Sequence, residues 1–220
     1  MTGQRILKSR VPSITKLSVA TAAAVQEEAS LTGVVMREVD ATGTNAEHLV
    51  LRQSVLVSTS LAGANLDQLV VEDVRLDACD FSNAAASRSR WTRVEVTGCK
   101  LTGARLDRAR FAHTRFTDCR MDFARMQLIV SQHLEFDRCT MRGAYFQESD
   151  LQDVRFRGCD LREADLRGAQ LARADLRGSN LESILITIEQ LRGIVVTSDQ
   201  ALYLCGLVGM KIDDEAPLLM

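Results

Sequence analysis

Apolar side chains recur at every fifth position over most of this chain. Between residues 31 and 181, thirty of the thirty-one positions whose numbers end in 1 or 6 are apolar, and the exception is Ser131. The positions two residues earlier hold only small or aliphatic residues, and neither set contains a charge. Side chains two positions apart face the same way in extended backbone. Each five-residue unit therefore predicts a short strand with two inward side chains.

Glycines indicate where these strands turn. All nine glycines between residues 30 and 180 stand two positions after a central apolar residue, where a tight turn requires a positive φ. Four strands and four corners close a square coil of twenty residues, and successive coils stack as parallel strands about 4.8 Å apart. The sequence thus predicts an all-β fold, a right-handed quadrilateral parallel β-helix of about eight coils.

The five-residue pattern fades toward both ends of the chain, which divides it into three parts. Residues 1–28 are expected to form an N-terminal cap or arm, and residues 29–186 the β-helix. Residues 187–220 are expected to form a C-terminal helical cap and dimerisation segment. Such caps are expected because the terminal coils of a solenoid would otherwise expose its core.

Each end contains a segment of helical composition. At the N-terminus, residues 18–29 predict a helical cap that begins at Ser18. At the C-terminus, residues 197–212 predict one short α-helix, which ends at Gly209. Thr197 and Gln200 have the spacing of a capping box at the start of that helix.

Five of the six cysteines are twenty residues apart, namely Cys79, Cys99, Cys119, Cys139 and Cys159. Because twenty residues make one coil, these thiols should form a ladder inside the rod. Free cysteine packs as a small hydrophobic residue, so structural packing is the favoured interpretation. A redox or metal role is the alternative.

Composition offers little chemistry. The net charge is −2, and the sequence has no phosphate-binding glycine loop, nucleophile elbow or CxxC pair, so neither an enzyme nor a cofactor is expected. No apolar run approaches the length of a membrane span, so no membrane association is expected. Six thiols without a secretory signal favour a cytoplasmic location. Because few aromatics are available to stack bases, direct nucleic-acid binding is not expected.

One small polar column leaves two interpretations open. His113 and His133 lie one coil apart at the same corner, and Asp153 lies one coil further on. Imidazole and carboxylate groups could form a weak surface metal site. Ordinary surface polarity explains the same residues.

Charged residues separate one face of the predicted rod from the other three. One face alternates in sign along the series Arg75, Glu95, Arg115, Glu135, Arg155 and Asp175. The other faces stack like charges, through residues that we call the basic girdle: Arg90, Lys100, Arg105, Arg110, Arg120 and Arg125. Residues 86–126 contain ten basic and four acidic side chains, whereas residues 31–85 contain three and eight. Stacked like charges cost energy, so the girdle is predicted to bind an acidic protein partner. Relief of the repulsion by Asp107, Asp122 and solvent is the alternative.

Several units of the repeat resemble a known family. The segments ADLRG at 164–168 and 174–178, ANLDQ at 64–68, ARLDR at 104–108 and CDLRE at 159–163 resemble the pentapeptide-repeat family, whose unit is A(D/N)LXX. The unbroken register is most similar to that of the MfpA-type members. The segment GIVVTSDQALYLCGLVG at 193–209 is also similar to their C-terminal end.

This resemblance has two functional implications. MfpA-type proteins pair tail to tail, which implies a homodimer through the apolar residues of the C-terminal helix: Ala201, Leu202, Leu204, Cys205 and Val208. The MfpA and Qnr proteins also bind DNA gyrase, inhibiting it or protecting it from quinolones. A mimic of the DNA duplex should be strongly acidic, however, and the middle of this rod is basic. A non-catalytic adaptor or regulator with an unidentified partner is therefore the first hypothesis, and gyrase modulation is the alternative.

Overall fold

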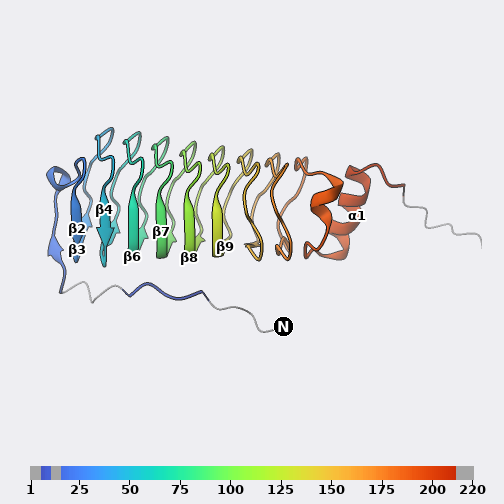
Figure 1. The fold of residues 1–220 in the computed structure, drawn as a ribbon, viewed down its shortest axis with the longest axis horizontal. Coiled ribbons are helices and arrows are strands. Elements are labelled where there is room, and N and C mark those ends of the chain that lie inside the picture. The colour runs from blue at the N-terminus through green and yellow to red at the C-terminus, as the bar shows by residue number, and fades with distance from the viewer. Residues whose placement is uncertain (1–5, 11–15, 212–220) are drawn as a thin grey trace, which may run out of the picture.

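The protein is a parallel β-helix, as the hydrophobic pattern predicts. The computed structural model describes residues 6–10 and 16–211 of the chain. Figure 1 shows coils stacked side by side along one axis, with the single described α-helix, α1 (Ser198–Leu207), beyond the last coil. The other elements are β1 (Ser18–Val19), η2 (Ala22–Ala24), β2 (Ser30–Thr32), β3 (Val34–Arg37), β4 (Val50–Arg52), β5 (Val55–Val57), β6 (Val70–Asp77), β7 (Arg90–Thr97), β8 (Arg110–Thr117), β9 (Val130–Asp137), β10 (Arg155–Arg157) and η3 (Ile188–Leu191).

Every coil pairs with the next at an offset of twenty residues. The parallel pairing begins with Ser30 opposite Val50 and continues to the bridge between Asp175 and Val195. The two faces that start at β6 and continue through β9 have the longest strands, and the other faces are joined mainly by isolated bridges. Because the offset never changes, any residue lies over the residue twenty positions earlier, and columns read from the sequence are columns in space.

The corners have a stricter geometry than the glycines alone indicate. Every position whose number ends in 3 or 8, from 28 to 183, has a φ between about +48° and +76°. Most of these residues are not glycine, although a positive φ is unfavourable for other L-residues. Phe123 and Leu128, with φ of 57° and 58°, are examples of bulky corner residues. The stacked coil above and below each corner stabilises a backbone conformation that the local sequence disfavours.

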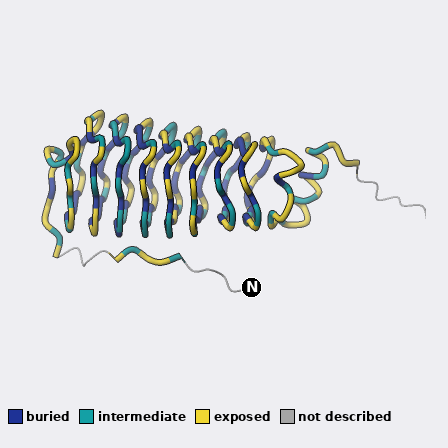
Figure 2. Tube along the Cα trace, in the orientation of Figure 1, coloured by how far each residue is buried: buried dark blue, intermediate teal, exposed yellow. Residues whose placement is uncertain are grey.

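The core is a continuous column of apolar side chains inside the coils. The central residues of one face include Phe116, Phe136 and Phe156, whose rings stack with centroids 5.3 and 5.2 Å apart. Figure 2 shows buried positions recurring along every coil, with exposed positions concentrated at the corners. Burial of such large side chains is the main source of stability for the rod.

The N-terminal cap differs from the predicted helix. Residues 18–29 form the two-residue strand β1 and the short 3-10 helix η2 instead of an α-helix that begins at Ser18. Strand β1 pairs with β3, and Ala20 and Val25 are buried in the core cluster. Pairing with the open edge of the first coil satisfies the backbone there, which an α-helix could not do.

The C-terminal cap agrees with its prediction more closely. Helix α1 begins after Thr197, and the capping box between Thr197 and Gln200 is formed on both sides. The Gln200 amide also donates to the carbonyls of Leu176 and Ser179, at 2.7 and 2.8 Å. The cap therefore donates hydrogen bonds to these two backbone carbonyls of the last coil. The outer parts of the two terminal segments, residues 1–5, 11–15 and 212–220, lie outside the described residues.

Candidate interaction surfaces

The structure brings the basic girdle together as the sequence predicts. Arg90 lies opposite Arg110 in the pairing of β7 with β8. The bridges between Lys100 and Arg120 and between Arg105 and Arg125 place the other two like-charge pairs one coil apart. All six side chains are exposed. The girdle is thus a belt of stacked cations around the middle of the rod.

Two members of the girdle have acidic partners within the rod. Lys100 Nζ lies 3.7 Å from Asp80, and Arg125 Nε lies 3.4 Å from Asp107. In the described part of the chain, Arg90, Arg105, Arg110 and Arg120 make no ion pair. Their positive charge is available to a partner.

The C-terminal coils treat their arginines differently. Arg162, Arg167 and Arg177 each donate through two nitrogens to the aspartate two positions earlier, at 2.6 to 2.9 Å. The Arg167 guanidinium lowers the pKa of Asp165 below its ordinary value. In these coils each of these arginines has an aspartate two positions earlier as its partner. Four of the six girdle residues have no such partner among the described residues.

The alternating column is in register, and Glu135 shows how it is stabilised. Glu135 is only 2% exposed, and it accepts from Arg115 at 2.8 Å and pairs with Arg157 at 3.1 Å. A buried carboxylate needs such partners, because it is costly to leave one unpaired. Glu95 instead accepts from Ser9 of the N-terminal arm, through both the backbone N–H and the hydroxyl.

The five aligned cysteines are free and buried. The thiol of Cys119 lies 3.3 Å from the carbonyl of Thr117 and 3.5 Å from that of Val96 on the previous coil. Hydrogen bonding with neighbouring thiols, together with burial, raises the pKa of Cys99 and Cys139. The same hydrogen bonds lower the pKa of Cys79, Cys119 and Cys159. Burial of all five thiols therefore identifies them as packing residues, whereas Cys205 is partly exposed.

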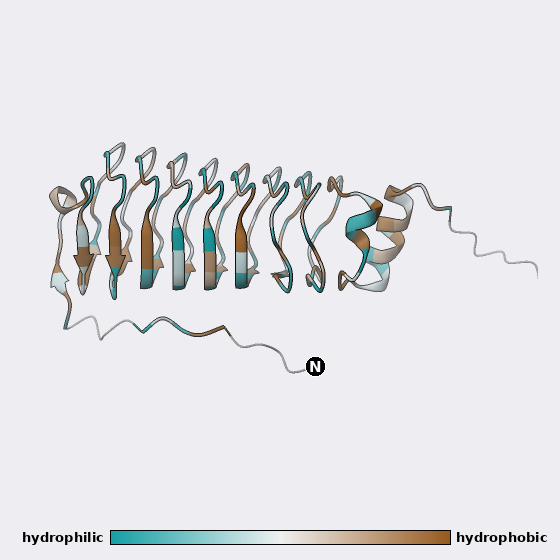
Figure 3. Ribbon diagram, in the orientation of Figure 1, coloured by the Kyte–Doolittle hydropathy of each residue, from teal (hydrophilic) through white to brown (hydrophobic). Residues whose placement is uncertain are grey.

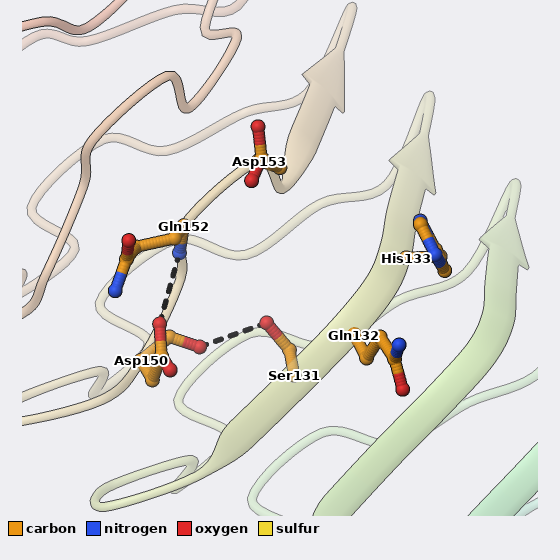
Figure 4. Close-up of a pocket in the computed structure, with 6 residues that line it drawn as sticks. All are labelled: Ser131, Gln132, His133, Asp150, Gln152 and Asp153. Carbon is orange, nitrogen blue, oxygen red and sulfur yellow. Dashed lines mark hydrogen bonds between the residues drawn. The ribbon is translucent and has the colours of Figure 1, made fainter. Parts of the chain in front are cut away.

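Ser131 interrupts the apolar core. Its hydroxyl donates to the carbonyl of Asp150 at 2.8 Å (Figure 4). The two coils stay paired beside it, because Val130 and Asp150 form a parallel bridge and the Asp150 N–H donates to the carbonyl of Ile129 at 2.9 Å. A shallow surface pocket of about 230 Å³ opens here, lined by Ser131, Gln132, His133, Asp150, Gln152 and Asp153.

The histidine column borders this pocket. His113 and His133 stack with ring centroids 4.5 Å apart. Both carboxylate oxygens of Asp153 accept hydrogen bonds from Arg173 at 2.7 Å and are engaged there. Among the described residues, no group of three or more potential ligands has a geometry that could hold a metal ion. The column fits a polar surface better than a metal site.

A segment near the N-terminus lies along the outside of the rod. We call residues 6–10 the N-terminal arm. Its backbone N–H groups donate to Asp73 from Arg10, to Glu95 from Ser9 and to His113 from Leu7. Figure 1 shows this segment running beside the coils, back toward the middle of the rod. No sequence pattern predicts these contacts, because they join positions 63 to 106 residues apart and follow no period.

The C-terminal helix presents apolar residues on two sides. Leu204, which the sequence assigned to a dimer interface, is 3% exposed and packs in the core of its own chain. Ala201, Cys205 and Val208 follow the same helical spacing and are partly buried. Leu202 is 54% exposed on the other side of α1. The C-terminal part of the chain also exposes apolar residues that were not among the predicted interface residues: Leu185, Ile188, Val195, Tyr203, Leu207 and Met210.

Exposed apolar residues also lie beside the girdle, and the predicted site did not include them. Leu128, Val130 and Tyr145 are 40 to 49% exposed. The five-residue pattern could have identified them, since each occupies an outward position. None of the helices in the described ranges is long and apolar enough to cross a bilayer.

Comparison with known proteins agrees with this geometry. A family model for a pentapeptide repeat region matches residues 89–166, and one for pentapeptide repeats matches residues 35–68. The chain belongs to the pentapeptide-repeat family. In this pentapeptide-repeat protein the two matches together span just over half of the sequence. No protein with a curated function matches the sequence.

Solved structures are similar to this chain at low sequence identity. A trypsin-treated variant of QnrB1, described as a plasmid-mediated fluoroquinolone resistance protein, is 17% identical, with a TM-score of 0.50 over 90% of this chain and 98% of that chain. Full-length QnrB1 is 17% identical, with a TM-score of 0.45 over 87% and 97%. HetL, a pentapeptide-repeat protein involved in heterocyst differentiation regulation in the cyanobacterium Nostoc, is 18% identical, with a TM-score of 0.36 over 80% and 94%.

Proposed function

We propose that this pentapeptide-repeat protein is a non-catalytic adaptor or regulator whose basic girdle binds an acidic surface of another protein. The observation that supports this proposal is the set of exposed arginines at 90, 105, 110 and 120, which make no ion pair with the residues that the structure describes. A rod selected only for stability could have paired them with aspartates, as the C-terminal coils do. Stacking like charges one coil apart costs energy because the charges repel each other. An acidic partner would offset this repulsion.

DNA gyrase is the alternative partner. The unbroken register and the C-terminal segment are similar to those of MfpA-type proteins, and QnrB1, with the same fold, is described as a fluoroquinolone resistance protein. The distribution of charge favours a mode of binding other than duplex mimicry. The acidic coils between residues 31 and 85 and the basic girdle would contact different surfaces of such a partner.

Charge reversal in the girdle tests the proposal. The double variant Arg105→Glu with Arg120→Glu should lose the partner in a pull-down, and binding by the unaltered protein should weaken as salt rises. A gyrase supercoiling assay, with and without a fluoroquinolone, tests the alternative partner with the same two proteins.

A matched control separates the girdle from net charge. Arg37→Glu with Arg192→Glu makes the same change in charge at two exposed arginines outside the girdle, and it should leave binding unchanged. Unchanged partner recovery and unchanged gyrase activity with the girdle variant would contradict the proposal.

A further inference from the structure

Along one edge of the rod, two further arginines lie beside the residues of the basic girdle. Arg88 and Arg108 occupy successive turns of one corner, since the Arg88 N–H donates to the carbonyl of Asp107 at 2.8 Å. Arg90 and Arg110 pair two positions further on. We call these four residues the arginine patch. All are exposed, and in the described part of the rod none of them makes an ion pair.

In the next coil, three columns of this edge change from arginine to an apolar residue. Arg108 is followed by Leu128, Arg110 by Val130, and Arg125 by Tyr145. These three apolar residues, which we call the apolar patch, are 40%, 49% and 40% exposed. In Figure 3 the upper parts of the strands facing the viewer are brown in β6, teal in β7 and β8, and brown again in β9.

The stability of the rod does not explain either patch. Leu128 lies at a corner with a φ of 58°, which a leucine adopts at a cost and an asparagine tolerates. Val130 leaves apolar surface in water next to Arg110, which makes no ion pair in the described part of the rod, and Tyr145 does so next to Arg125, whose partner is Asp107. Arginine and tyrosine are enriched at the energetic centres of protein interfaces, where apolar contacts exclude water from charged ones.

We propose that the arginine patch and the apolar patch form one docking surface for an acidic protein segment that carries a hydrophobic side chain beside its carboxylates. This inference rests on the proposed function and specifies the partner. Charge complementarity selects the acidic residues, and Leu128 and Val130 select the hydrophobic one. The three coils extend about 15 Å along the rod, a length that about five extended residues would cover.

The same chemistry disfavours a nucleic acid as the occupant. Phosphates would bind the arginines, but they would leave Leu128 and Val130 in water. An acidic peptide with an apolar neighbour satisfies both patches. The acidic residues that come next in two of these columns, Asp150 after Val130 and Asp165 after Tyr145, mark the end of the surface toward the C-terminus.

Two labelled peptides test the docking surface by fluorescence anisotropy. One has four glutamates followed by two leucines, and the other replaces the leucines by serines. The full-length protein should bind the leucine peptide about tenfold more tightly than the serine peptide. The variant Leu128→Asn with Val130→Thr should bind both equally, whereas Arg108→Gln with Arg110→Gln should weaken both. Val19→Thr, at an aliphatic residue that is 82% exposed in β1, is the matched control and should change neither affinity.

The outcomes distinguish this inference from the proposed function. Equal affinities of the unaltered protein for the two peptides would overturn the apolar patch as a contact and leave the girdle as the binding surface. Binding of neither peptide would overturn the docking surface, while the pull-down with the girdle variant tests the proposed function separately. A 20-base-pair DNA duplex that binds as tightly as the leucine peptide would assign the surface to nucleic acid. Loss of self-association in Leu128→Asn with Val130→Thr would assign it to a second copy of this chain.

Discussion

The backbone N–H of Leu7 donates a hydrogen bond to Nδ1 of His113, 3.4 Å away, and fastens the N-terminal arm to the middle of the rod. An acceptor at Nδ1 requires the neutral ring, because the imidazolium has a proton on both nitrogens. Burial, together with His133 and Arg93, lowers the pKa of His113 below its ordinary value of 6.5. The arm therefore binds the form of His113 that its surroundings favour.

This contact predicts that acid releases the arm. Because the pKa of His113 is lowered in the folded state, its contribution is complete above about pH 6.5 and is lost as the pH falls. Protection of the Leu7 and Ser9 amides from hydrogen exchange, corrected for the intrinsic rate, should decrease on acidification from pH 7 to pH 5. His113→Asn keeps an acceptor at a corner that tolerates asparagine, and it should remove this pH dependence. The same decrease in that variant would contradict the assignment of the release to His113.

The exposed face of α1 predicts a homodimer. Leu202 and Leu207 are 54% and 41% exposed, and Leu204 is engaged in its own core, so the interface should use the outer side of the helix. Light scattering should give the mass of a dimer for the full chain and of a monomer for Leu202→Asp with Leu207→Asp. Val19→Asp, at the opposite end of the rod, should not change the mass. A monomeric unaltered protein would contradict the prediction.

The thiol ladder should tolerate substitution. Cys119→Ala should lower the free energy of unfolding by about 1 kcal/mol through a small cavity. Cys119→Ser should be closer to neutral, because the Ser179 hydroxyl of the same ladder donates to the carbonyl of Phe156 at 3.1 Å. Urea unfolding measures both changes. In the native protein a thiol reagent should label Cys205 quickly and the five ladder cysteines only after unfolding, and rapid labelling of all six would show that the ladder is accessible.

Gly143 should be less replaceable than Gly98, another corner glycine. A Cβ at this position would lie 2.9 Å from the Phe123 ring of the previous coil, whereas one at Gly98 would meet nothing within 4 Å. Both glycines have a φ of 61°, so alanine at either costs about 1 kcal/mol for the backbone. Gly143→Ala should therefore lower the melting temperature further than Gly98→Ala. Equal decreases would mean that the exposed ring of Phe123 moves aside freely.

The hydroxyl of Ser131 links two coils, because it donates to the carbonyl of Asp150 at 2.8 Å. Ser131→Ala should lower the free energy of unfolding by about 1 kcal/mol, and Ser131→Thr, which keeps the donor, should lower it less. Chemical denaturation of the three proteins measures the difference. If alanine were as stable as serine, water would be an adequate substitute for the hydroxyl.

The sequence by itself determined the coil, its corners and its columns. Each residue contacts the residue twenty positions away, so the pairing of Arg105 with Arg125, or of Phe116 with Phe136, could be read directly from the numbering. A repeat converts long-range packing into a local rule, because the same offset applies to every coil. The capping box at Thr197 was readable for a similar reason, since its two partners are three residues apart.

Tertiary structure alone decided the contacts that do not repeat. The N-terminal arm reaches Asp73, Glu95 and His113 across changing sequence separations, so no period indicates them. Pairing with the first coil, which local composition cannot report, makes residues 18–29 a strand and a 3-10 turn instead of a helix. Leu204 packs inward and Leu202 outward because the last coil occupies one side of α1. The repeat fixes which residues are neighbours, whereas the folded chain fixes which of their side chains are engaged and which remain free for a partner.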